Sequence, residues 1–64
     1  MKLLLTMSLD NSAYQYVHDD DSTELDVSAV AVNIRAVAND IERGWTKGII
    51  MDYNGNKVGH WSID

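Results

Sequence analysis

One stretch of this chain has the apolar periodicity of a helix, and it is long enough for a single helix. Between about Thr23 and Arg43, valines and isoleucines recur at spacings of three and four residues. These residues are Val27, Val30, Ile34, Val37 and Ile41. Side chains with this spacing form one apolar stripe on a helix. Because only one stretch has this pattern, the sequence predicts a domain with one helix. A single helix can cover only one face of a sheet.

Polar residues mark both ends of the predicted helix. Asp21 or Ser22 can cap its start, and Asp21 followed by Glu24 resembles a capping box. Arg43 followed by Gly44 suits a helix end, because a cation favours the last turn and glycine readily adopts the left-handed conformation. Valine is a modest helix former, so we expect packing on a sheet to hold the helix in place.

The N-terminal segment predicts a half-buried strand. From Lys2 to Asp10 the side chains alternate, with Leu3, Leu5 and Met7 on one side. Alternation with a period of two residues is typical of a strand that has one face buried. Residues 13–17 contain alternating tyrosines. This pattern leaves open whether they form a short strand or a turn that packs its tyrosines on the sheet.

The C-terminal third predicts a β-hairpin. Two apolar runs, residues 45–52 and 57–64, flank a turn at Asn54-Gly55. Asn-Gly between apolar runs favours a type I′ turn, in which both central residues have positive φ. With that turn the sequence predicts the pairs Asp52–Lys57, Ile50–Gly59 and Gly48–Trp61. In the last pair, the indole ring can lie over the bare glycine backbone.

These elements combine into an α+β fold with the order βαββ, a single domain over residues 1–64. One helix packs on one face of a small three-stranded sheet that ends in the C-terminal hairpin. The pattern leaves open whether the N-terminal strand lies beside the second or the third strand.

Composition excludes several classes of protein. The 64 residues contain no cysteine, which excludes a disulfide framework and a thiolate zinc site. A net charge of −5 disfavours direct binding to nucleic acid or to an anionic membrane. No apolar run approaches the ~20 residues of a membrane span. We expect a cytoplasmic protein without cofactors and without enzymatic activity.

Both ends of the chain resemble a group of small uncharacterised phage and prophage proteins. The segment Asp10 to Tyr14 reads Asp-Asn-x-Ala-aromatic, and residues 48–63 follow the pattern G-x-I-x-D-x-N-G-N-x-V-G-x-W-x-I. In this group an N-terminal strand, one helix and a C-terminal hairpin follow one another. The resemblance implies a phage or prophage origin and an accessory role in the host cell, and it brings no known activity.

A patch of apolar residues is left over when the helix has covered one face of the hairpin. We expect the opposite face to remain open, and exposed apolar clusters mark interaction surfaces. The candidate partner-binding residues are Trp45, Ile49, Met51, Val58 and His60. The expected partner is a second copy, giving a homodimer, or a host or phage protein.

An acidic cluster precedes and overlaps the start of the predicted helix, and it suggests an alternative function. Its members are Asp19, Asp20, Asp21, Glu24 and Asp26. Such a cluster can imitate nucleic-acid phosphates and inhibit a host enzyme that handles nucleic acid, although acids are also favoured at a helix start. The sequence gives little support for a metal site. Residues 52–56 lack the spacing of a calcium loop, and His18 with its neighbouring aspartates has no distant ligand.

Overall fold

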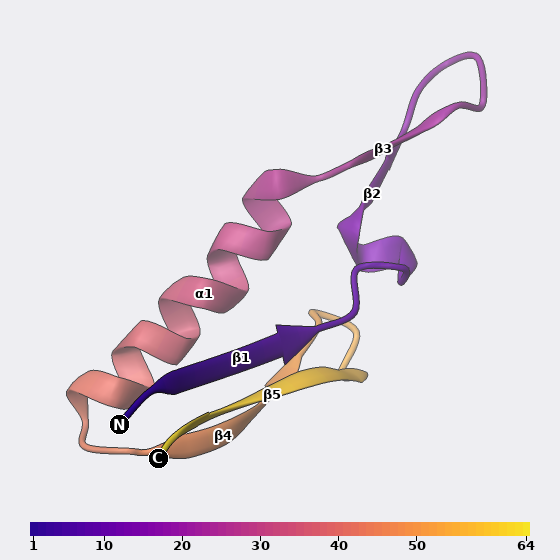
Figure 1. Cartoon of the computed structure of the whole chain (residues 1–64). Helices are drawn as coiled ribbons and strands as arrows, with labels where there is room; N and C mark the ends of the chain where they lie inside the picture. Colours follow the sequence, from indigo (N-terminus) through magenta and orange to yellow (C-terminus); the bar gives the residue numbers. More distant parts are fainter.

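The computed structural model describes residues 1–64 and contains one α-helix and five strands in two sheets (Figure 1). In chain order the elements are β1 (Leu3–Met7), a 3-10 turn η1 (Ser12–Tyr14), β2 (Gln15–Val17), β3 (Thr23–Leu25), α1 (Val27–Glu42), β4 (Lys47–Met51) and β5 (Lys57–Ile63). The expected α+β fold is confirmed, with one helix on a small sheet and a C-terminal hairpin. The question left open for residues 13–17 is resolved as a turn at η1 followed by the short strand β2, but the pairing of β2 with β3 was not predicted.

The three-stranded sheet has the order β1-β5-β4, and both strand pairs are antiparallel. The last strand is therefore central, which settles the strand order left open by the sequence. Val37 of α1, Ile50 of β4 and Trp61 of β5 form the buried core of this layer. Leu5 and Met7 of β1 pack against that core, as their alternation predicts.

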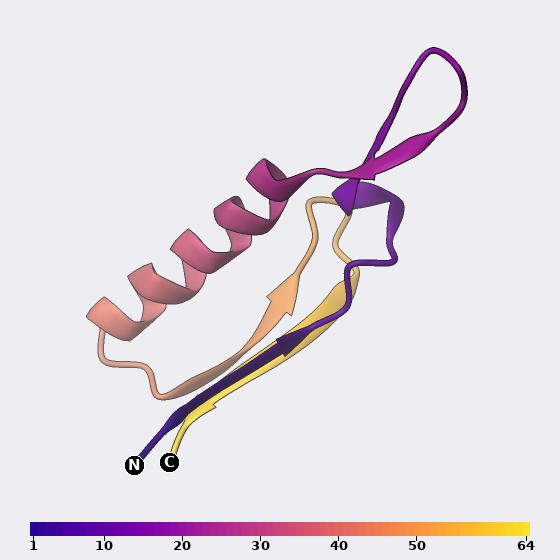
Figure 2. The same cartoon turned by 45° about the horizontal axis from the view of Figure 1, so that its top comes forward.

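Helix α1 covers less of the sheet than its apolar stripe predicts. It packs closest to β4, and it runs on that side of the sheet in Figure 2. Val37 is buried and Ile41 is half-buried, but Val27 is 69% exposed and Ile34 is 42% exposed. The apolar stripe is therefore core only in part, because a groove separates the N-terminal half of α1 from η1 and residues 51–53, and Asn33 bridges it with hydrogen bonds to Tyr14 and Met51.

The helix begins at Val27, later than predicted. Residues 23–25, expected in the first helical turn, form β3 and pair with β2. The cap is Asp26, whose carboxylate accepts hydrogen bonds from the backbone N–H groups of Ser28 and Ala29. The predicted cap at Asp21 or Ser22 and the capping box with Glu24 were wrong, because strand pairing with residues 15–17 competes successfully for this segment.

The β2–β3 hairpin projects from the body, and we call residues 15–25 the arm. In Figures 1 and 2 the arm extends beyond one end of the three-stranded sheet, while the two termini lie together at the other end. The molecule is accordingly elongated, measuring 45 × 18 × 16 Å. Few residues can be buried in such a shape, and only 6 of 64 are.

The β4–β5 turn differs from the predicted type I′ turn. Gly55 has positive φ and Asn54 does not. The N–H of Gly55 donates to the carbonyl of Asp52, and the N–H of Asp52 donates to the carbonyl of Asn56. This is a three-residue loop, a type I turn followed by a left-handed residue. The Gly48–Trp61 and Ile50–Gly59 pairs are confirmed, but Lys57 pairs with Met51 and not with Asp52.

Candidate interaction surfaces

The face of the three-stranded sheet that points away from α1 has no covering layer, and we call it the outer face. Strand alternation places Leu4, Lys47, Ile49 and His60 on it. Leu4 is 54% exposed and Ile49 is 58% exposed. Trp45, just before β4, is 61% exposed. Trp45 and Ile49 are therefore exposed close together at the β4 edge, and Leu4 is exposed on the other side of the central strand β5.

A shallow hollow of about 720 Å³ lies where residues 44–49 meet residues 60–62. Trp45, Ile49 and His60 all border it, so the structure brings together three of the five residues proposed from the sequence. Lys47 is the charged residue at this hollow, and no acidic residue lines it. The hollow can accept an apolar group whose neighbour is acidic or a hydrogen-bond acceptor.

The other two predicted partner-binding residues lie elsewhere. Val58 is half-buried and packs against the core of the sheet. The pairing register shifts between Ile50 and Met51, so Val58 is the extra residue of a β-bulge. The bulge interrupts the strict alternation from which Val58 was predicted to lie on the outer face. Met51 is 44% exposed, but it borders a groove beside α1 and not the hollow.

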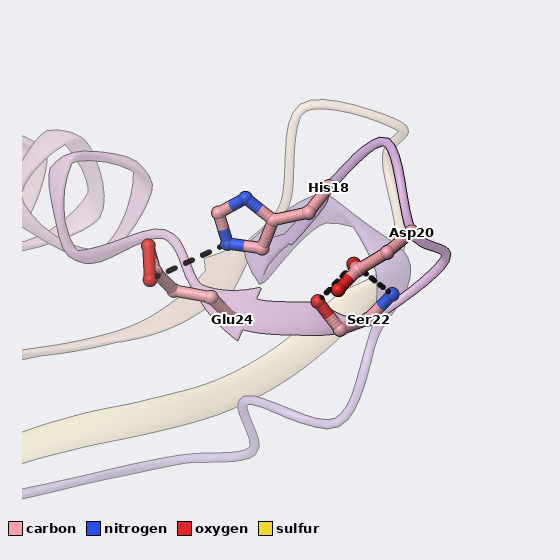
Figure 3. A network of polar contacts seen from close by, with 4 residues as sticks. All are labelled: His18, Asp20, Ser22 and Glu24. Carbon is pink, nitrogen blue, oxygen red and sulfur yellow. Dashed lines mark hydrogen bonds and ion pairs between the residues drawn. The ribbon is translucent and has the colours of Figure 1, made fainter.

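The arm displays most of the acidic cluster at its tip. Asp19, Asp20, Asp21 and Glu24 are all exposed there. Asp20 accepts hydrogen bonds from the backbone N–H and the hydroxyl of Ser22, and His18 lies 3.5 Å from the carboxylate of Glu24 (Figure 3). The Ser22 hydrogen bonds hold the pKa of Asp20 below its usual value.

The tip of the arm repeats the loop geometry of the β4–β5 turn. The N–H of Asp21 donates to the carbonyl of His18, and the N–H of His18 donates to the carbonyl of Ser22. Asp21 has φ 67°, the left-handed conformation that Gly55 adopts in the other loop. Aspartate tolerates this conformation better than most residues. The sequence signal for this hairpin was weak because each of its strands is only three residues long.

Asp26 is separated from the acidic tip by its role at the helix. Its carboxylate accepts from Ser28 and Ala29, which lowers its pKa and compensates free N–H groups of α1. Of the five predicted acidic residues, four therefore share the arm and one serves as the helix cap.

A second hollow, a groove of about 630 Å³, separates the N-terminal half of α1 from η1 and residues 51–53. Tyr14 is fully buried at this groove and donates a hydrogen bond to Asn33, 2.7 Å away. Asn33 in turn donates to the carbonyl of Met51 at 2.8 Å. Burial and the nearby Asp52 raise the pKa of Tyr14. This chain of hydrogen bonds fixes η1, α1 and β4 to one another.

Asp52 organises the same region from the loop side. Its carboxylate accepts hydrogen bonds from the backbone N–H groups of Asn54 and Asn56 and from the side chains of Asn56 and Asn11. Only 6% of Asp52 is exposed, and these bonds lower its pKa, with the Asn56 N–H contributing most. Sequence reasoning treated Asp52 as a strand residue. The signal it overlooked is aspartate at the first position of an Asp-x-Asn-Gly turn.

The Asp52 contacts predict acid-sensitive stability. The pKa of Asp52 is lower in the folded chain than in the unfolded chain. The stability that the ionised Asp52 contributes is therefore complete above about pH 4, the unfolded pKa, and is lost as the pH falls through the lower pKa of the folded chain. We expect the melting temperature of the wild type to decrease as the pH is lowered below about 4. This decrease should be smaller in Asp52→Asn. Asp19→Asn, the same change on the arm, is the control. Equal acid profiles for Asp52→Asn and the wild type would contradict the assignment.

No group of three or more histidine, aspartate or glutamate side chains has an arrangement that could hold a metal ion. The helix α1 is too short and too polar to cross a membrane. Comparison with protein-family models, with curated proteins and with solved structures finds no match. The resemblance to small phage and prophage proteins therefore stays a prediction from the residues at the two ends of the chain.

Proposed function

We propose that this protein is a non-enzymatic accessory protein that acts by binding another protein through the outer face of its sheet. The observation that carries the proposal is the exposed pair of Trp45 and Ile49 at the border of the hollow, with Leu4 also exposed on the same face of the sheet. The only helix lies on the opposite side, so no element of the chain can cover these side chains. Contiguous exposed apolar groups with polar neighbours are typical of interaction sites.

The charge around the hollow indicates what the partner presents. Lys47 borders the hollow together with His60, and no acid is among the lining residues. A partner with an apolar anchor beside an acidic or carbonyl group would match both the hollow and the lysine. The acidic arm is at the far end of the molecule and would not oppose such a contact.

The proposal predicts that a charge in the hollow abolishes partner binding. Ile49→Lys places an ammonium group among the apolar side chains of the outer face. Val32→Lys is the matched control, because Val32 is 61% exposed and Ile49 is 58% exposed. Affinity capture with the tagged chain, followed by mass spectrometry, should lose its specific partner with Ile49→Lys and retain it with Val32→Lys. Equal retention by both variants would argue against the outer face.

The origin and location of the protein belong to the same proposal. The N-terminal Asp-Asn-x-Ala-aromatic segment and the pattern of residues 48–63 support a phage or prophage protein that works in the cytoplasm of the host cell. The succession of β1, α1 and the β4–β5 hairpin supports that resemblance, with the arm inserted between β1 and α1.

The geometry of the arm supports a second candidate function. Four exposed acids lie together on a hairpin that projects from the body, as expected of an inhibitor that occupies a basic site on a host nucleic-acid enzyme. In the same capture experiment, Asp19→Lys combined with Asp21→Asn keeps a residue that tolerates the left-handed conformation. Loss of the partner with this variant, and retention with Ile49→Lys, would favour the inhibitor over the outer-face contact.

A further inference from the structure

Strand β1 is an edge of the three-stranded sheet, so half of its backbone N–H and C=O groups have no strand to pair with. The N–H of Lys2 donates to the carbonyl of Asp64, and the N–H of Asp64 donates back to Lys2. Further along, the N–H of Ser8 donates to the carbonyl of Val58. In an antiparallel pair alternate residues bond to the partner strand, so Leu4 and Thr6 also bond to β5. The N–H and C=O groups of Leu3, Leu5 and Met7 consequently point to the open edge.

This edge lacks the features that protect sheet edges from pairing. Charged side chains, prolines, bulges and covering elements normally block such edges. Strand β1 reads Leu-Leu-Leu-Thr-Met, and none of its residues is charged or proline. Its pairing with β5 runs without a register shift from Leu3 to Met7. The edge is thus a regular strand with free donors and acceptors.

The opposite edge of the sheet, β4, is partly protected. Its Lys47 is charged, and the carbonyl of Met51 accepts a hydrogen bond from the side chain of Asn33. Helix α1 packs closest to this strand. The two edges of one sheet are therefore unequal, and β1 is the edge that remains available.

We propose that β1 pairs with β1 of a second copy of this chain, antiparallel and centred on Leu5. In this register Leu3 lies opposite Met7 of the second copy, and Leu5 lies opposite its own equivalent. These are the residues whose backbone groups point to the open edge, so every free group of the strand acquires a partner. The two three-stranded sheets then join into one continuous sheet about a two-fold axis.

The chemistry of β1 favours a second copy over an unrelated strand. On one side of the joined sheet the pairing places Leu3, Leu5 and Met7 against the same apolar residues, and on the other it places Leu4 opposite Thr6. No charge faces a like charge, although each chain has a net charge of −5. The antiparallel arrangement sends the two acidic arms to opposite ends, because each arm lies beyond the C-terminal end of its own β1. Both α1 helices lie toward the outer β4 edges, away from the junction.

Amide hydrogen exchange of the unmodified protein tests the proposal residue by residue. In a monomer the amides of Leu4 and Thr6 are protected, while those of Leu3, Leu5 and Met7 exchange freely. In the proposed dimer all five amides are protected, and the odd-numbered ones lose protection on dilution. Odd-numbered amides that exchange freely at millimolar concentration would overturn the proposal.

Backbone N-methylation by chemical synthesis tests the same edge by removing one donor while keeping the side chain. N-methyl-Leu5 removes the central hydrogen bonds from both copies and should raise the dimer dissociation constant by about 100-fold or more. N-methyl-Ile49 is the matched control, because alternation points its N–H to the free edge of β4. Sedimentation equilibrium should show dimers for the wild type and this control, and monomers for N-methyl-Leu5. Dissociation by N-methyl-Ile49 alone would overturn the proposal.

The inference rests on the proposed function only in taking protein–protein contact as the mode of action, and it uses a different surface. A chain that stays monomeric at millimolar concentration, yet loses its captured partner with Ile49→Lys, would overturn the edge pairing and leave the outer-face function standing. A dimer that persists while Ile49→Lys retains every captured partner would support the edge pairing and contradict the outer-face function.

Discussion

Replacing Gly59 with alanine is expected to separate β1 from β5 and unfold the sheet. A Cβ at this position would lie 2.0 Å from the carbonyl oxygen of Thr6 and 2.7 Å from Cα of Met7. Both are backbone atoms, so no side-chain rotation relieves the overlap and β1 must move. Overpacking costs about 1–3 kcal/mol and occasionally more, and a domain of this length has about 3–10 kcal/mol in total. We expect a loss of more than about 3 kcal/mol.

Far-UV circular dichroism with urea titration measures this effect, and two variants test its cause. Adding Met7→Ala to Gly59→Ala should not restore stability, because the overlap with the Thr6 carbonyl remains. Gly44→Ala should cost less, about 1–2 kcal/mol, because a Cβ there meets no atom within 4 Å and the cost comes only from its φ of 95°. A larger loss for Gly44→Ala than for Gly59→Ala would contradict the close approach of β1 and β5.

The contact at Gly59 shows where prediction from sequence reaches its limit. The pairing of Gly59 with Ile50 follows from the position of the β4–β5 turn, and it was predicted correctly. The strand on the other side of Gly59 could not be predicted, since hydrophobic alternation is the same whichever strand is central. The order of the strands in a sheet depends on tertiary packing, which local sequence patterns do not determine.

The arm and the helix start were missed for a different physical reason. Residues 23–25 have acidic and apolar side chains that suit a first helical turn as well as a short strand. Pairing with residues 15–17 and the capping hydrogen bonds of Asp26 decide between the two. The strand pairing depends on the loop at Asp21, whose left-handed φ is not signalled by a glycine.

The candidate site was predicted in part. Ile49 and His60 follow the alternation of their strands, and Trp45, just before β4, borders the same hollow. Val58 was predicted on the outer face of the sheet, but it packs on the core side. The turn begins at Asp52, earlier than in an Asn-Gly type I′ turn, and Val58 becomes the extra residue of a bulge. The groove at Tyr14 and Asn33 could not be predicted, because it joins three elements whose relative positions are set by tertiary contacts.

Trp61→Ala is expected to have a comparably large effect, a loss of about 3–5 kcal/mol. Trp61 is 1% exposed, and it forms the core with Val37 and Ile50. The chain offers a matched control in Trp45→Ala, because Trp45 is 61% exposed and its removal should change stability by less than about 0.5 kcal/mol. Urea unfolding followed by circular dichroism compares the two without relying on tryptophan fluorescence. Similar losses for both variants would contradict the assignment of Trp61 as the centre of the core.

The contact between Trp61 and Gly48 makes this prediction sharper. A Cβ on residue 48 would lie 2.8 Å from the indole Nε1, and this buried N–H has no hydrogen-bond partner. Gly48→Ala should therefore destabilise the chain by overpacking, and Trp61→Phe should destabilise it by leaving space beside Gly48. In the double variant the new methyl group occupies the space left by the indole, so its loss of stability should be smaller than the sum of the two single losses. Strictly additive losses would show that the indole does not lie against residue 48, since independent sites add and contacting sites do not.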